Sequence, residues 1–128
     1  MAKKILQVVE SAFRATLEEQ DDTVIWITHA MKGAGADLSV LLRGNAVYYG
    51  VKGQDASGLS FGAKRQTQPP RLADDVAKLV EKGVEVHVVE DDVAARGIER
   101  SELVAGLKPV SKGGLAKLFA QYDLVFHW

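Results

Sequence analysis

The stretch that decides the fold is VEVHVVEDDVAARGI, residues 84–98. Its first six residues are rich in β-branched side chains, a composition that favours a strand over 84–89. Three acidic residues follow without a turn, and EDDVAAR predicts a short helix over 90–96 that ends at Gly97. A strand that leads directly into a helix is the repeating unit of α/β proteins.

The segments on either side continue this alternation. PPRLADDVAKLVEKG has the apolar spacing of a helix over 69–83, with prolines at its start and Gly83 at its end. Further along, we predict a helical turn over 101–104 and a short strand over 107–110. A helix capped by Ser111 follows over 112–122, and a last strand over 123–128. This order predicts a parallel sheet with helices on both faces.

The N-terminal third supports two interpretations. Residues 2–9 could form the first strand, but the apolar residues there also fit one face of a helix. Residues 23–28 have strand composition, although their apolar residues belong to a helical spacing as well. Periodicity does not separate these alternatives in short apolar runs. After Gly35 the pattern is clearer, and residues 36–43 predict a strand.

Length and composition bound the class of protein. A chain of 128 residues is the usual size of one domain, here 1–128. The formal net charge is −1 with both signs mixed along the chain, so no broad positive surface is available to nucleic acid. No run approaches the roughly 18 apolar residues that cross a bilayer, and the N-terminus lacks a signal-like apolar segment. We expect a cytoplasmic protein whose partners include neither nucleic acid nor a membrane.

The acidic run Glu90-Asp91-Asp92 has two interpretations. Carboxylates at a helix start bond to free N–H groups and oppose the positive end of the helix dipole. A divalent cation could also bind acids, but consecutive helical residues point in different directions and seldom converge on one ion. The sequence therefore favours helix capping over a metal or acid–base site.

Other candidate motifs carry less information. The G-x-G of KGAGAD (32–37) follows a predicted helix and lacks the third glycine of a dinucleotide site. The SKGG turn (111–114) lies between a strand and a helix, where its N–H groups could hold an anion. The histidines have no metal-ligand spacing, so the sequence predicts no metal site. Residues 52–70 form a long loop, a length usually found in functional or mobile segments.

Three stretches of the chain carry a resemblance to a known family. They are LSVLLRGNAV (38–47), EKGVEVHVVEDDVAARGI (81–98) and SELVAGLKPVSKGGLAKLFAQYDLVFHW (101–128). In this order, with Arg96-Gly97 after the short helix, they resemble the DsrE/DsrF-like family, small α/β proteins that include sulfur-relay subunits. The resemblance implies a single three-layer α/β/α domain with a mainly parallel sheet of about five strands. It also implies a strand over 2–9 and a helix over about 16–34.

The resemblance also bears on chemistry. In sulfur-carrying members a cysteine ends the third strand and accepts sulfur as a persulfide, whereas the matching residue here is Val89 and the chain has no cysteine. Valine has no nucleophilic atom, so this chain cannot carry a persulfide. We expect no catalytic residue and no cofactor, and a non-catalytic accessory or binding protein linked to sulfur metabolism.

Assembly and a binding site are implied in the same way. The resemblance implies trimers or hexamers of the chain, or complexes with related DsrE-like subunits. We expect the aromatic C-terminus and the Tyr48-Tyr49 pair at interfaces. The ligand or partner is expected where the second and third strands end, at a site formed by Asn45, Val89, Glu90, Asp91, Asp92 and Arg96.

Two other functions stay open at this point. One is a small-molecule- or metal-binding enzyme that uses the acidic helix start at 90–92 with His29 or His87. The other is a small-molecule binder that uses the SKGG turn and the loop 52–70.

Overall fold

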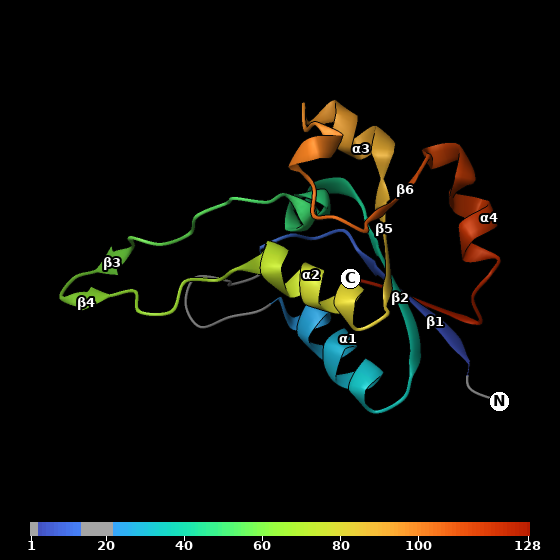
Figure 1. Cartoon of the computed structure of the whole chain (residues 1–128), viewed down its shortest axis with the longest axis horizontal. Coiled ribbons are helices and arrows are strands. Elements are labelled where there is room, and N and C mark those ends of the chain that lie inside the picture. Colours follow the sequence, from blue (N-terminus) through green and yellow to red (C-terminus); the bar gives the residue numbers. More distant parts are fainter. Residues whose placement is uncertain (1–2, 14–21) are drawn as a thin grey trace.

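The computed structural model describes residues 3–13 and 22–128, and its main sheet has five strands (Figure 1). These strands are β1 Lys4–Val9, β2 Asp37–Leu42, β5 Glu85–Val89, β6 Lys108–Val110 and β7 Leu124–His127. The α-helices of the described residues are α1 Thr23–Gly33, α2 Leu72–Glu81, α3 Glu90–Ala95 and α4 Leu115–Phe119. Their 3₁₀ helices are η1 Gly44–Gly50, η2 Arg100–Glu102 and η3 Lys112–Gly114. A separate hairpin joins β3 Ser60–Phe61 to β4 Lys64–Arg65.

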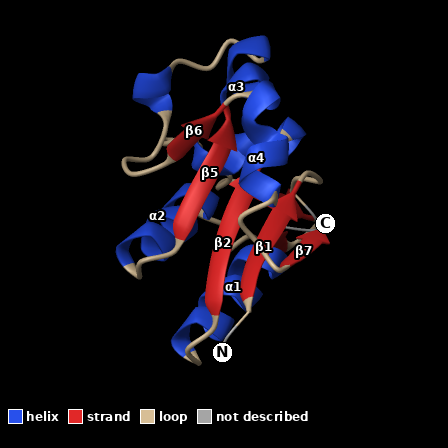
Figure 2. Cartoon of the chain, turned by 90° about the vertical axis from the view of Figure 1, so that its right-hand side faces the viewer, coloured by secondary structure: helices blue, strands red, loops and turns tan. Residues whose placement is uncertain are grey.

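The strand order is β6-β5-β2-β1-β7, and every neighbouring pair is parallel. The chain adds β2, β5 and β6 on one side of β1 and then returns to place β7 on the other side (Figure 2). The sequence prediction of about five mainly parallel strands is therefore confirmed, and the main sheet is parallel throughout. Because parallel strands share a direction, their carboxyl ends meet at one edge, where β2 and β5 end side by side.

Helices cover both faces of this sheet. α1 and α2 lie on the first face, and α4 lies on the second (Figures 1 and 2). Strand alternation divides the core accordingly: Val40 and Leu42 pack in the cluster under α1 and α2, whereas Leu41 packs with Leu115 and Leu118 of α4. The prediction of three layers is confirmed.

The predicted helix over 16–34 began too early. Asp22 has extended backbone angles, and its buried carboxylate accepts hydrogen bonds from the N–H groups of Val24 and Ile25, at 2.9 and 3.3 Å. Asp22 is thus the N-cap, and α1 begins at Thr23. Residues 16–21 lie outside the described residues. The strand predicted over 2–9 is confirmed as β1.

The segment after β2 also differs from expectation. Residues 44–50 form a 3₁₀ helix that the sequence did not predict, and Tyr49 within it is fully buried. Tyr49 is therefore a core residue, and the expectation that the Tyr48-Tyr49 pair lies at an interface is wrong for Tyr49. Its hydroxyl donates to Oδ2 of Asp22 at 2.6 Å and accepts from the N–H of Phe13 at 2.6 Å.

In the C-terminal half, the predicted order of elements is confirmed with shorter helices. α2 spans Leu72–Glu81 and ends before Gly83, which has a positive φ of 90° that suits glycine. Ser111 is the predicted N-cap, but it caps η3, and α4 follows only at Leu115. None of the helices that the structure describes is long and apolar enough to cross a membrane.

Candidate functional site at the carboxyl edge of the sheet

The structure brings together the residues that follow β2 and β5. The strands are paired in register, with Leu42 beside Val88, so η1 and α3 start next to each other. The Oδ1 atom of Asn45 accepts hydrogen bonds from Nε and Nη2 of Arg96, at 3.2 and 2.9 Å. Nη1 of Arg96 donates to the carbonyl of Asp92 at 3.1 Å. Asn45 and Arg96 therefore form one contact across the two strand ends.

The three acids at the start of α3 bind three different elements. Oδ2 of Asp92 accepts from the N–H of Gly44 in η1 at 2.8 Å, and Oδ1 of Asp91 accepts from the N–H of Lys112 in η3 at 2.8 Å. Glu90 lies 3.5 Å from Nη2 of Arg100 in η2. Because the carboxylates diverge, they do not form a joint ligand set. Over residues 3–13 and 22–128, no group of three or more His, Cys, Asp or Glu residues could hold a metal ion.

The sequence interpretation of these acids as caps of their own helix is wrong in detail. Val89 occupies the N-cap position of α3, and no side chain caps it. The acids do lie in the first turn, where the helix dipole favours negative charge. Their hydrogen bonds, however, connect α3 to η1 and η3, so they fix the loops at the carboxyl edge of the sheet.

Loss of one such contact has a measurable cost. We expect Asp92→Ala to lower the free energy of unfolding by about 1–3 kcal/mol, because the partly buried N–H of Gly44 loses its acceptor. Urea unfolding measures this difference. The matched control is Glu90→Gln, which removes a half-exposed ion pair and should cost at most about 0.5 kcal/mol. Equal effects of the two changes would contradict the role given to Asp92.

Val89 is completely buried at the end of β5. It packs on the second face of the sheet in a cluster with Leu6, Val8 and Leu41, beneath Leu115 and Leu118 of α4. An aliphatic side chain in this place contributes to the core and offers no group that could bond to a ligand. Of the predicted site residues, Asn45, Glu90 and Asp91 are exposed, whereas Asp92 and Arg96 are partly buried.

The histidines of the enzyme alternative do not contact the acids of α3. Nδ1 of His29 lies 3.2 Å from Nζ of Lys82. His87 is buried on β5, and its Nε2 atom lies 3.6 Å from Oε2 of Glu85. Burial lowers the pKa of His87, although the Glu85 carboxylate opposes this shift. The hydrogen bond from Lys108 lowers the pKa of Glu85 in turn.

His87 gives the protein a predicted pH dependence. Because burial depresses its folded-state pKa, the unfolded chain takes up a proton near pH 6.5 while the folded chain takes it up only at lower pH. Stability is therefore expected to fall as the pH drops below about 6.5. Melting curves from pH 8 to pH 5 should show a steeper loss for the wild type than for His87→Gln. Parallel curves would exclude His87 as the cause.

The SKGG turn is already occupied by the protein itself. The N–H of Lys112 donates to Asp91, and the N–H of Gly114 donates to the hydroxyl and the carbonyl of Ser111. Two of the groups that could have held an anion are thus bonded within the chain. This weakens the expectation that the turn binds phosphate-bearing ligands.

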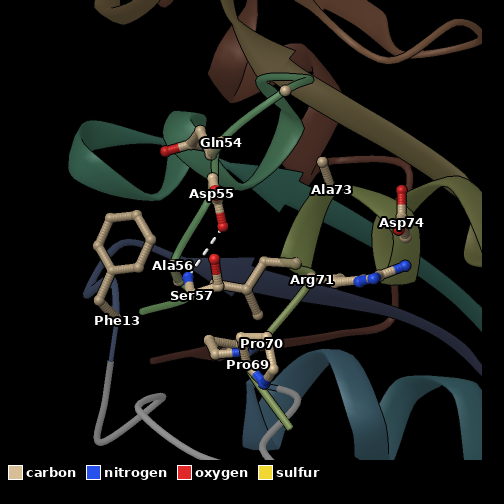
Figure 3. A pocket seen from close by; sticks show the side chains of 12 residues that line it. Phe13, Gln54, Asp55, Ala56, Ser57, Pro69, Pro70, Arg71, Ala73 and Asp74 are labelled. Atoms are coloured by element: carbon tan, nitrogen blue, oxygen red, sulfur yellow. Dashed lines mark hydrogen bonds between the residues drawn. The ribbon is translucent and has the colours of Figure 1, made fainter. Parts of the chain in front are cut away.

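A cavity of about 490 Å³ lies elsewhere, at the base of the loop 52–70 (Figure 3). Phe13, residues 53–57 and residues 69–74 line it, so it opens beside the first turn of α2. Ser57 lowers the pKa of Asp55, whose carboxylate accepts from the Ser57 N–H at 2.9 Å. Sequence reasoning singled out the loop by its length, but nothing in the pattern placed Phe13 against it.

Comparison with known proteins identifies the family. Over residues 3–128 the chain matches the model of the DsrE/DsrF-like family, and it belongs to that family. No curated protein matches it significantly. Among solved structures, it is similar to the ychN protein from E. coli, at 20% identity and a TM-score of 0.75, over 98% of this chain and 99% of that one. It is also similar to the protein of unknown function MTH1491 from Methanobacterium thermoautotrophicum, at 11% identity and a TM-score of 0.66, with the same coverage of both chains.

These findings confirm the resemblance read from the sequence and the α/β fold that it implied. The chain is thus a member of the DsrE/DsrF-like family that contains no cysteine. At these identities the two solved structures bear on the fold alone.

Proposed function

We propose that the protein is a non-catalytic, oligomeric accessory or binding member of the DsrE/DsrF-like family, linked to sulfur metabolism but unable to carry a persulfide. The observation that carries the proposal is the carboxyl edge of the sheet. Its turns are held in place by the Asn45–Arg96 contact, while a buried valine occupies the end of β5. An ordered site without a nucleophile suits recognition better than group transfer.

The proposed binding surface is formed by Asn45, Val89, Glu90, Asp91, Asp92 and Arg96. Val89 shapes the surface from below, since its side chain is buried, and the exposed groups are the amide of Asn45 and the carboxylates of Glu90 and Asp91. A ligand or partner at this place would meet the carboxylate acceptors of Glu90 and Asp91 and the amide NH2 donor of Asn45, beside one guanidinium group. Its partners, in this proposal, are copies of the chain or related DsrE-like subunits.

The last strand supports self-association. β7 forms one edge of the sheet, and the side chains of Leu124, Val125, Phe126 and Trp128 are each between 37 and 47% exposed. Exposed apolar edge strands are usually paired or covered, since they otherwise promote aggregation. We propose that subunits of a trimer or hexamer cover this strand.

Native mass spectrometry of gently purified protein tests the proposal. We expect a homo-oligomer, and any extra mass on it would begin to identify a bound ligand. The variants Asp91→Ala and Arg96→Ala should lose such a ligand or partner while remaining folded by circular dichroism, and Lys117→Ala on the exposed side of α4 should retain it. A ligand-free monomer would contradict the proposal.

One observation favours a second candidate, a small-molecule binder. The cavity beside α2 has a volume within the usual range of ligand sites and is lined by both apolar and charged residues. This function predicts that a ligand raises the melting temperature and protects the loop 52–70 from proteolysis. Protection at the loop with no effect of Arg96→Ala would favour the second candidate over the first.

A further inference from the structure

The loop 52–70 extends away from the body of the molecule as an arm (Figure 1). Residues 52–65 are all exposed, and β3 and β4 pair over only two residues each. A two-stranded hairpin of this size is marginally stable by itself in water. The arm also exposes Leu59 by 41% and Phe61 by 62%. An apolar tip on a weak hairpin is expected to need a surface that orders and covers it.

Beyond Asp55, the charges of the arm have one sign. Between residues 56 and 73 the sequence contains three basic residues, Lys64, Arg65 and Arg71, and no acidic one. Two of the three belong to β4, directly across the hairpin from β3. The tip is therefore apolar and positively charged, and its preferred surface would be apolar and negatively charged.

The chain has such a surface beside the carboxyl edge of the sheet. A recess of about 130 Å³ lies between α3, η2 and β6, and its lining includes Val88, Val93, Ala94, Ile98 and Leu103. Its volume is comparable with the roughly 150 Å³ of an apolar cavity that holds a benzene ring. Glu90, from the proposed binding surface, lies on its border with Arg100. Residues 90–102 contain five acidic and two basic residues, the opposite charge balance to that of the arm.

The arm does not fill the recess of its own chain. Phe61 and Leu59 are exposed, and the residues that line the recess come from 88–109 alone. Within one molecule, an apolar basic projection and an apolar acidic recess are thus both left uncovered. Since each is complementary to the other in polarity and charge, two copies of the chain can cover both.

We propose that the arm of one subunit docks into the recess of a neighbouring subunit, with Phe61 in the recess and Lys64 and Arg65 beside the acids of 90–102. This inference rests on the assembly in the proposed function and names the contact that makes it. The contact joins two different surfaces, so each subunit has one free arm and one free recess. Repetition of such a head-to-tail contact closes into a ring when the rotation allows, as trimers and hexamers require.

A mixing experiment tests this geometry. Phe61→Asp removes the apolar tip and leaves the recess intact, whereas Ala94→Arg obstructs the recess from an exposed position on α3 and leaves the arm intact. Each variant alone should associate at least about 30-fold more weakly than the wild type, the effect of losing a central interface residue. An equimolar mixture should recover association as one-to-one complexes, because the second variant's arm fits the first variant's recess, whereas the first variant's altered arm and the second variant's blocked recess prevent ring closure. Native mass spectrometry with one variant isotopically labelled counts the mixed complexes.

Charge reversal tests the same contact independently. Arg65→Glu and Glu90→Arg should each weaken association, and the double variant should recover it, with the effect decreasing at high salt. Circular dichroism checks that every variant is folded, which is expected because all the substituted side chains are exposed. Wild-type assembly in each single variant, or no recovery on mixing, would overturn the inference and leave the proposed function standing. A monomeric wild type would overturn both.

Discussion

Asp22→Ala is expected to lower the free energy of unfolding by about 2–4 kcal/mol. The carboxylate of Asp22 has two roles in the core. Oδ1 caps α1 through the N–H groups of Val24 and Ile25, and Oδ2 accepts the hydroxyl of Tyr49. Alanine removes the cap, worth about 0.5–2 kcal/mol, and leaves the buried hydroxyl without this acceptor, which costs about 1–3 kcal/mol.

Urea unfolding of the variant measures the loss. Asp37→Ala is the control, because Asp37 is an exposed acid at the start of β2, and its replacement should change stability by at most about 0.5 kcal/mol. Tyr49→Phe should cost less than Asp22→Ala, since the N-cap survives. The double variant Asp22→Ala/Tyr49→Phe should lose less free energy of unfolding than the two single variants combined, because both substitutions remove the same hydrogen bond. Strict additivity would show that the bond contributes nothing.

The variant Val89→Cys is expected to place a thiol at the position that the family resemblance matches to a sulfur-accepting cysteine, and yet to leave that thiol unreactive. The substitution is close in volume, so its stability cost should remain below about 1.5 kcal/mol. Because Val89 is completely buried under α4, a reagent in water could reach the thiol only after local opening. Burial among apolar side chains also disfavours the thiolate that would react.

The natural chain has no cysteine, so every such variant carries a single thiol. We expect the Val89→Cys thiol to react with a disulfide reagent about 100-fold more slowly than that of Ala95→Cys, an exposed position on α3, the helix that follows β5. Both should react equally fast in denaturant. Rapid reaction of the native Val89→Cys variant would mean that the end of β5 is open to a sulfur donor.

Local sequence patterns predicted the strands of the main sheet. The run VEVHVV and the final LVFH are rich in β-branched and aromatic residues, a composition that favours strands. The N-terminal strand was ambiguous by periodicity, and the family resemblance decided it correctly. The start of α1 was not predicted. Asp22 accepts hydrogen bonds from the N–H groups of Val24 and Ile25, and its carboxylate also accepts one from Tyr49, which is distant in the sequence.

The sequence and its family resemblance indicated which residues of the candidate site lie near one another, but not which atoms they contact. The family resemblance implied a site where the second and third strands end, so Asn45 and Arg96 were expected near one another, and the pairing of β2 with β5 brings them together. The hydrogen-bond partners of Asp91 and Asp92 could not be predicted, because each carboxylate accepts from the backbone of a segment that is distant in sequence.

The sequence by itself determined the α/β class, the order of elements in the C-terminal half and the absence of a thiol, because these depend on composition and short-range pattern. Only the tertiary structure decided what surrounds each side chain. It buried Val89 and Tyr49, directed three neighbouring acids to three different elements, and left the arm and the recess exposed on one chain. Burial and hydrogen bonding between distant segments depend on how the layers pack, and no local pattern encodes that packing.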